Sequence, residues 1–261
     1  MRFVLDQLEL GETPLIADEA NDVILTRETS PEIAKLIQDV GDWQLSSLGG
    51  IAASFNMIDS RTVEYLNEYA GVHIRSINDT TRRQIITELA EGISKGEGSR
   101  QLARRVRSVF DEASVTRSVA IARTETTAAS NFAREAAFHQ AGPGVVTGKQ
   151  WLATRDRRTR DRHRRLNRQI VALNRDFEID GMRAKYPGGF ASAAMNVNCR
   201  CTILPVVPSV DRQDADEPDG SLEQFDKLRD DWEERLQRAF RRGFRKQEAA
   251  VMRVFRRLDD R

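Results

Sequence analysis

Both cysteines of this 261-residue chain lie close together, in the sequence Asn198-Cys199-Arg200-Cys201. Residues two apart on a strand point to the same side, so a strand here would place both thiols on one face. Cysteine is a small, polarisable side chain that commonly fills a core, and this is the simpler interpretation of the pair. The Cys-x-Cys spacing is poor for a local disulfide, which favours a reducing compartment.

A second interpretation makes the two cysteines half of a zinc site. His163 lies upstream of them, and Asp156 or Asp161 would complete a tetrahedron, because zinc accepts thiolate, imidazole and carboxylate ligands. Structural zinc sites usually contain more cysteines at wider spacing. We therefore expect no resident cofactor, and we keep zinc bound by His163, Cys199 and Cys201 as the alternative.

Asp156, His163 and Arg200 form a second candidate group. A carboxylate held by a forked guanidinium is a strong and oriented pair, so we expect Asp156 to pair with Arg200. With His163 titrating near neutrality, the three residues suggest a phosphodiester-cleaving enzyme; the alternative is an ion pair that fixes the fold. No nucleophile completes a catalytic constellation, so we expect no enzymatic activity.

A run of arginines begins after Thr154, and only Asp156 and Asp161 offset its charge. Arginine suits phosphate better than lysine does, so the run favours contact with DNA backbone or with an acidic protein surface. No aromatic residues interleave with it, which argues against base stacking and favours non-specific, salt-sensitive binding. Arg168 continues the run, and the residues expected to contact nucleic acid are Arg155, Arg157, Arg158, Arg160, Arg162, Arg164 and Arg165.

Charge along the chain is uneven although the formal net charge is only +1. Residues 149–185 are strongly basic, 211–234 are acidic and 235–261 are basic again, and such patches decide partners. The first residues lack the apolar run of a signal peptide, and no segment has the apolar length that spans a bilayer. We expect a soluble protein that works inside a cell.

The elements that position these groups are mostly helices, and we expect a mostly helical α+β fold. Apolar residues recur at helical spacing through the first half, with helix starts at Ser30-Pro31, Asp59 or Ser60, Thr80 or Thr81, Ser99 and Ser114. Gly71 is expected to end the second of these helices. Strands are expected at 150–153 and 197–207. The expected divisions are an N-terminal arm (1–29), a helical domain (30–143), a small mixed domain with short strands (144–208), a linker (209–220) and a long amphipathic helix (221–261).

The last helix has apolar residues spaced close to the 3.6-residue period from Leu222 to Leu258, and Gly243 is its expected weak point. A helix of this length needs the body of the protein or a partner to cover its apolar face. Earlier in the chain, Arg123 and Glu125 are two apart and do not share a helix face, so we expect each to anchor its helix to the small domain.

Several short motifs occur in an order that resembles the phage Mu F-like minor head protein family. They are Ile121-Ala122-Arg123-Thr124-Glu125, Lys149-x-Trp151, Asp156-x-x-Thr159-Arg160-x-x-His163, Tyr186-Pro187-Gly188 and Asn198-Cys199-Arg200-Cys201. The resemblance covers about residues 80–208, and the closing Asn-Cys-Arg-Cys is its most specific part. The family often has glycine after His-x-x-Leu, where this chain has Leu166-Asn167-Arg168. The motif residues are Arg123, Glu125, Trp151, Asp156, His163, Pro187, Asn198, Cys199, Arg200 and Cys201.

The resemblance implies a minor capsid protein of a tailed phage or prophage that acts in head morphogenesis. It implies few copies near the portal vertex in the capsid interior, with the host cytoplasm as the place of assembly. The implied partners are the portal, the major capsid protein and packaged double-stranded DNA, with a possible oligomer at the portal. Two rival hypotheses stay open: the phosphodiester-cleaving enzyme and a zinc-stabilised module that binds nucleic acid.

Overall fold

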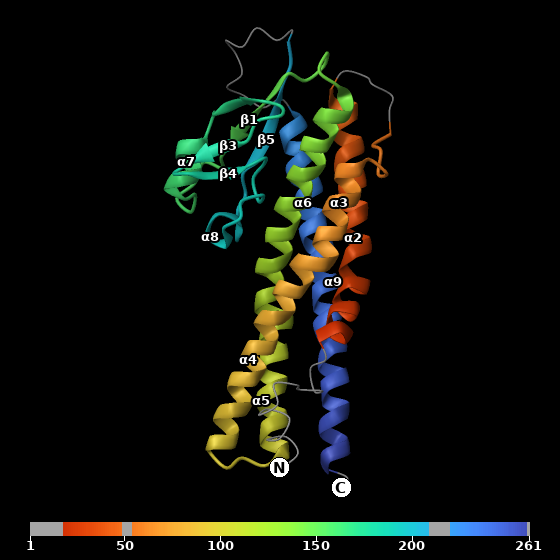
Figure 1. The fold of residues 1–261 in the computed structure, drawn as a ribbon, viewed down its shortest axis with the longest axis vertical. Helices are drawn as coiled ribbons and strands as arrows, with labels where there is room; N and C mark the ends of the chain where they lie inside the picture. The colour runs from red at the N-terminus through yellow and green to blue at the C-terminus, as the bar shows by residue number, and fades with distance from the viewer. Residues whose placement is uncertain (1–17, 49–53, 209–219, 260–261) are drawn as a thin grey trace. The chain divides into compact units, whose positions relative to one another are not determined.

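The computed structural model describes residues 18–48, 54–208 and 220–259, and their fold is mostly helical α+β, as expected (Figure 1). The described residues form two compact units. The helical unit comprises residues 18–31, 66–119 and 238–259, and the mixed unit comprises 32–48, 54–65, 120–208 and 220–237. The expected helical domain of residues 30–143 is therefore divided, because its long helices contribute to both units.

The helical unit is built around α4 (Ile74–Ser94) and α5 (Ser99–Glu112), which the turn after Ser94 joins. The predicted start at Ser99 is confirmed: the Gln101 side chain accepts a hydrogen bond from the backbone N–H of Gly98 at 2.9 Å. Such a contact satisfies a donor that a helix start otherwise leaves free. The apolar stripes predicted from the sequence are buried in this unit, at Ile85, Leu89, Leu102, Val106 and Phe110.

The first helix, α2 (Asp18–Ser47), begins twelve residues before the predicted start at Ser30 and contains Pro31. The expected arm is therefore helical from residue 18 to residue 29, and residues 1–17 lie outside the described part. Proline costs a helix one backbone hydrogen bond. Here the burial of Leu25 and the hydrogen bond from Thr29 Oγ1 to Leu25 O (2.9 Å) hold the turn before it.

Three other predicted boundaries are wrong, although Asp59 does cap α3 (Ser60–Glu68) by accepting from Arg61 N at 3.0 Å. Gly71 lies in a π-helical segment, η2 (Tyr69–His73), that continues into α4. Thr80 lies inside α4, and its hydroxyl donates to Ser76 O. Ser114 lies in a second π-helical segment, η3 (Ala113–Arg117), and donates to Asp111 O. Serine and threonine hydroxyls can bond to the preceding turn, so they are ambiguous signals for a helix start.

All described strands belong to the mixed unit, where they gather with two short helices beside α6 (Ser118–Ala141) (Figure 1). One antiparallel sheet has the strand order β2-β1-β5, with Trp151 opposite Ile203, and β3 and β4 form a hairpin. Gly142, at φ +84°, ends α6, next to the expected end of the helical domain at residue 143. The elements are β1 (Gly148–Leu152), α7 (Asp161–Leu166), β2 (Ile170–Ala172), β3 (Phe177–Ile179), β4 (Met182–Ala184), α8 (Ala193–Asn196) and β5 (Thr202–Val206).

Strand β5 is shorter than the predicted 197–207, and neither cysteine lies on it. The chain turns before the strand: Asn198 has φ +55°, and Cys199 N donates to Asn196 O at 2.9 Å. The two thiols nevertheless lie near the same atom, His163 Nδ1, although the cysteines are not on a strand. The core around them is aromatic, with Phe177 at 5.2 Å and Phe190 at 6.0 Å from the Trp151 ring.

The last helix, α9 (Gly220–Asp259), confirms the predicted helix from residue 221, and the linker before it lies outside the described residues. Its apolar face is covered by the chain itself: Phe225 and Trp232 are buried in the mixed unit, and Phe244 in the helical unit. Gly243 is not a weak point of the helix. It allows the Leu25 side chain to pack closely against α9, because a Cβ at position 243 would lie 2.5 Å from Leu25 Cδ1. No helix in the described part of the chain has the length and apolarity to cross a membrane.

Candidate functional site

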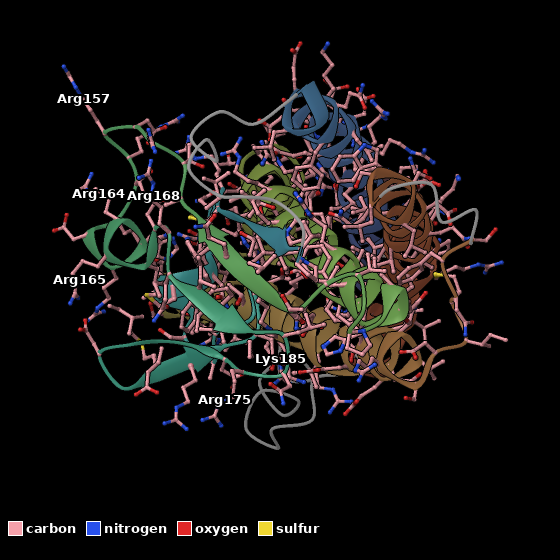
Figure 2. All side chains as sticks on the ribbon, turned by 90° about the horizontal axis from the view of Figure 1, so that it is seen from above. Arg157, Arg164, Arg165, Arg168, Arg175 and Lys185 are labelled. Atoms are coloured by element: carbon pink, nitrogen blue, oxygen red, sulfur yellow. The ribbon has the colours of Figure 1, made fainter. Side chains whose placement is uncertain are left out.

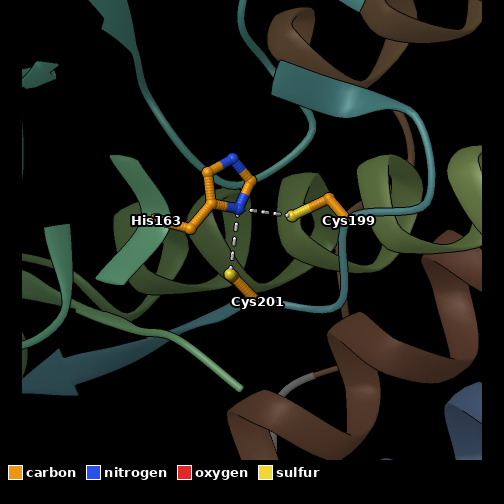
Figure 3. Close-up of side chains that lie close together, drawn as sticks. All are labelled: His163, Cys199 and Cys201. Atoms are coloured by element: carbon orange, nitrogen blue, oxygen red, sulfur yellow. Dashed lines mark hydrogen bonds between the residues drawn. The ribbon is translucent and has the colours of Figure 1, made fainter. Parts of the chain in front are cut away.

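His163, Cys199 and Cys201 come together in the mixed unit, and we call them the His–Cys cluster (Figure 3). His163 Nδ1 lies 3.3 Å from Cys201 Sγ and 3.6 Å from Cys199 Sγ. All three side chains are buried, each at most 3% exposed. His163 lies on the inner side of α7 with Leu166, three residues on, while the arginines of α7 face outward. The six-residue helix therefore separates a buried ligand-like group from a charged surface.

The two thiols share their proton unequally. Hydrogen bonding to Cys201 and burial raise the pKa of Cys199 well above its ordinary value. The hydrogen bond from Cys199 lowers the pKa of Cys201 to about 5, and His163 and the backbone N–H of Thr154 lower it further against the effect of burial. Of the two thiols, Cys201 is therefore the more readily ionised.

Asp156 pairs with Arg200, as predicted, with Oδ1 accepting from Arg200 Nη2 at 2.8 Å. This hydrogen bond, helped by the backbone N–H of Arg158, holds the pKa of the Asp156 carboxyl well below its usual range. Asp161 is 87% exposed and pairs with Arg164. The idea that Asp156 or Asp161 completes a tetrahedron with the cluster is therefore wrong, since both carboxylates face arginines and neither belongs to the group of potential ligands.

The same geometry gives the phosphodiester-cleaving hypothesis no accessible base. His163 is 2% exposed and its Nδ1 faces the two sulfur atoms. Asp156 is held by Arg200. A general base must reach the proton that it abstracts, and neither group is free to do so.

One face of α6 binds the backbone around the cysteines, which the sequence did not lead us to predict. Thr124, Thr127, Asn131 and Arg134 are three or four residues apart and so lie on one side of the helix. Thr127 Oγ1 donates to Cys199 O at 2.7 Å. Asn131 donates to Cys201 O at 3.0 Å and accepts from Ile203 N at 3.2 Å, Thr124 Oγ1 accepts from Asn198 N at 3.1 Å, and Arg134 Nη1 donates to Thr202 Oγ1 at 3.1 Å.

Arg134 is a buried arginine, only 2% exposed. Its guanidinium carbon lies 4.4 Å from the ring centroid of Phe225 and 5.2 Å from that of Trp43. Burial lowers the pKa of Arg134 to about 9, so it stays charged at neutral pH. Two aromatic faces thus take the place of a carboxylate, since their quadrupoles attract a cation.

A second buried charge pair joins α6 to the sheet. Lys149 Nζ on β1 lies 3.2 Å from Glu135 Oε1, which also lies 3.1 Å from His139 Nε2. Burial lowers the pKa of Lys149. Burial alone would raise the pKa of Glu135, but His139 and Lys149 together hold it below its ordinary value. The pair lines a cavity of about 180 Å³ with Arg61, Leu173, Asn174, Asp176 and Lys185.

Among the arginines expected to contact nucleic acid, all except the half-buried Arg160 are exposed. Figure 2 shows Arg157, Arg164, Arg165 and Arg168 extending away from the ribbon around α7. Asp180, which the sequence did not connect with the run, pairs with Arg162 at 2.9 Å and with Arg165 at 2.6 Å. Asp180 therefore offsets part of the positive charge on α7, which the sequence did not indicate.

No acidic side chain offsets the positive charge of Arg155 or Arg157: within the described residues, no carboxylate lies within ion-pair distance of either. Both line an open groove of about 550 Å³ in the mixed unit. Arg160 is half-buried and donates to Val197 O. The other residues lining the groove are Ala153, Thr154, Asp156, Arg164 and Asn167.

Three other motif positions have clear structural roles. Arg123 pairs with Glu233 of α9 at 2.9 Å, so it anchors α6 to the last helix and not, as expected, to the small domain. Pro187 is buried next to Gly188, which has φ +92° and would place a Cβ 2.8 Å from Ala128 Cα. Arg168, in the segment after His-x-x-Leu where the family often has glycine, takes the left-handed conformation with φ +68°.

Comparison with known proteins supports the resemblance. Minor head protein GP7 of Bacillus phage SPP1 is 35% identical over 133 residues, 49% of this chain and 43% of that protein. NAD(+)--arginine ADP-ribosyltransferase EFV of Enterococcus faecalis is 27% identical over 222 residues, 78% of this chain and 45% of that protein. An uncharacterized protein of Methanocaldococcus jannaschii, MJ0329, is 26% identical over 207 residues, 79% of this chain and 30% of that protein.

The chain spans less than half the length of each of these curated relatives. No solved structure matches it significantly. The sequence profile of the family described as Phage Mu protein F like protein matches residues 83–204, which contain the His–Cys cluster, the arginine run and the binding face of α6. The resemblance expected from the short motifs is thus confirmed, and residues 83–204 of this chain match the phage Mu F-like family.

Proposed function

We propose that this chain is a minor head protein that acts in head morphogenesis of a tailed phage or prophage. The 35% identity with Minor head protein GP7, within a region that the family profile also matches, is the observation that carries this proposal. The chain would act by docking on the portal or the major capsid protein in the capsid interior, and by contact with packaged DNA. Catalysis has no part in the proposal, since the candidate acid–base residues are buried or paired.

The exposed arginines support a contact with DNA backbone. Arg155 and Arg157 present guanidinium groups at a groove, and Arg164 lines the same groove. Guanidinium groups bind phosphate oxygens through paired N–H donors. The strands beside this surface are short and carry no exposed aromatic platform among the described residues, so the contact would not read sequence.

A binding experiment tests the DNA contact. Full-length protein and the double variant Arg155→Ala/Arg157→Ala are titrated with two unrelated duplexes at several salt concentrations. Wild type should bind both duplexes equally, and the variant should reduce the slope of log K against log salt by about 2, close to one for each phosphate that is no longer neutralised. Arg104→Ala/Arg253→Ala removes the same charge from exposed positions of the helical unit and should keep the wild-type slope.

Absence of binding at low salt, or an equal reduction in both double variants, would contradict the DNA contact. The head role has its own test. Tagged full-length chain is mixed with the portal protein and, separately, with the major capsid protein of the same genome, and purified heads are analysed by quantitative mass spectrometry. We expect capture of one of the two proteins and a few copies of the chain per head; a chain missing from heads that captures neither would overturn the proposal.

The sequence left open whether the body of the protein or a partner covers the apolar face of the terminal helix. Its apolar face is covered, with Phe225, Trp232 and Phe244 all buried. Deleting it would expose the core of both units, so a truncated chain is a poor probe of docking. Full-length protein with substitutions of exposed side chains is the suitable probe.

A further inference from the structure

We propose that His163, Cys199 and Cys201 bind one zinc ion, with a water as the fourth ligand, and that this ion holds α7 against the segment that leads into β5. The inference goes beyond the head role and does not depend on it, because metal content is measured without DNA or capsid proteins. Three observations carry it: the distances between the ligand atoms, the chemical types of the ligands, and the burial of the group.

The distances match the edges of a tetrahedron around zinc. With Zn–N of about 2.0–2.1 Å and Zn–S of about 2.3 Å, the N···S edge is about 3.6 Å. His163 Nδ1 lies 3.3 Å and 3.6 Å from the two sulfur atoms, and all three ligand atoms lie within 4.8 Å of one another. An ion at the centre therefore requires only small shifts of the side chains.

The residue types suit zinc. Zinc binds cysteine as the thiolate and histidine as the neutral imidazole, so the three side chains supply two sulfur ligands and one nitrogen ligand. Among the described residues, no further histidine, cysteine or carboxylate joins this group, so the fourth position is left to water.

Burial makes a group without metal costly. The three side chains are each at most 3% exposed, so bulk water does not solvate a thiolate there. The Trp151 ring lies edge-on to His163 at 5.8 Å, which keeps the imidazole in place. A divalent cation satisfies the imidazole and both thiolates together.

Such an ion would act as a cross-link in a region with little regular structure. The ligands are 36 and 38 residues apart in sequence. The strands between them have only three residues each. Closing a loop of this length lowers the entropy of the unfolded chain, so bound zinc should stabilise the mixed unit. It would also fix the outward side of α7, where Arg162 and Arg165 lie.

The test uses full-length protein purified under reducing conditions. Elemental analysis should find about one zinc per chain, and replacement by Co²⁺ should give the intense near-ultraviolet band of thiolate–cobalt charge transfer. Cys199→Ser, Cys201→Ser and His163→Asn should each reduce zinc to below one tenth of the wild-type content. His139→Asn, which removes a histidine of the same unit outside the cluster, should keep it.

A second measurement needs no variant and so does not depend on whether the variants fold. The chain has only two cysteines, so a thiol reagent reports on the cluster alone. Adding a chelator to wild type should speed thiol modification at least tenfold and lower the melting temperature of the mixed unit, and added zinc should reverse both. Three results would overturn the proposal: less than half an equivalent of zinc after exposure to excess zinc, no effect of chelator on thiol reactivity, or a Cys199–Cys201 disulfide in reduced preparations.

Discussion

The two units bury polar side chains in different ways. In the helical unit, Asn78 and Gln247 meet through a neutral amide hydrogen bond of 2.9 Å within a core of aliphatic and aromatic side chains. In the mixed unit, Arg134, Glu135 and Lys149 are charged and buried. A neutral hydrogen bond contributes modestly, whereas a buried charge is costly unless its partners are in place. The helical unit thus depends on apolar volume, and the mixed unit on the completeness of its polar contacts.

The distribution of tryptophan allows the comparison to be measured. Trp43, Trp151 and Trp232 are the three tryptophans of the chain, and all belong to the mixed unit. Tryptophan fluorescence therefore follows the mixed unit, whereas far-ultraviolet circular dichroism follows the helices of both units. Urea unfolding recorded by both methods separates their stabilities.

The largest expected effect comes from removing one partner of a buried charge pair. Lys149→Met should reduce the free energy of unfolding of the mixed unit by about 3–5 kcal/mol, because Glu135 would keep its charge without its ammonium partner. The change is measured by urea unfolding followed by tryptophan fluorescence. Glu135→Leu/Lys149→Met removes both charges and should restore most of the stability, so equal costs for the single and double variants would contradict a charge-specific role.

The next effect comes from the binding face of α6. Asn131→Leu should reduce the free energy of unfolding of the mixed unit by about 2–4 kcal/mol, since Cys201 O and Ile203 N would lose buried partners. Hydrogen exchange at Ile203 should become faster. Ser130→Ala is the control: Ser130 is buried but bonds only within its own helix, so this change should cost less than about 1 kcal/mol.

A smaller effect concerns pH and the pair between Asp156 and Arg200. The folded-state pKa of Asp156 lies below its unfolded value, so its contribution is complete above about pH 5 and is lost as the pH falls further. The stability difference between wild type and Asp156→Asn should therefore shrink from about pH 5 to about pH 3. Arg200→Gln should reproduce the same pH dependence, and a difference that grows on acidification would refute this assignment.

The smallest expected effect tests local helix rules in the helical unit. Thr87 is exposed within α4, and its hydroxyl bonds only to Arg83 O. Thr87→Ala should stabilise the helical unit by about 0.5 kcal/mol, because alanine has the higher helix propensity. The gain should appear in circular dichroism and not in tryptophan fluorescence, and Thr87→Ser should give no comparable gain.

In the helical unit, the spacing of apolar residues correctly predicted which helix face is buried. The residues at which helices begin were predicted less well. Leu102, Val106 and Phe110 are spaced for one buried face, and this face is observed. Thr80 and Ser114 resemble caps but bond to carbonyls of the preceding turn. A hydroxyl at a single position does not reveal which of these two bonds it makes.

The candidate site was predicted only in part, for a related reason. Asp156 and Arg200 are complementary charges, and their pairing followed from chemistry. The contacts of Asn131 with Cys201 and Ile203, 70 and 72 residues away, have no such local signal. The spacing of Thr124, Thr127, Asn131 and Arg134 on an alanine-rich helix was the available hint, since polar residues that share a face with alanine indicate a buried polar contact.

Arg134 also bears on the order in which the protein can be completed during translation. Its cation is enclosed by aromatic rings from positions 43 and 225, so about ninety residues of later chain must leave the ribosome before the second ring arrives. Until then, only the ring of Trp43 is available to contact the Arg134 guanidinium in the nascent mixed unit. The mixed unit can therefore complete its core only after the ribosome has synthesised the part of α9 that carries Phe225.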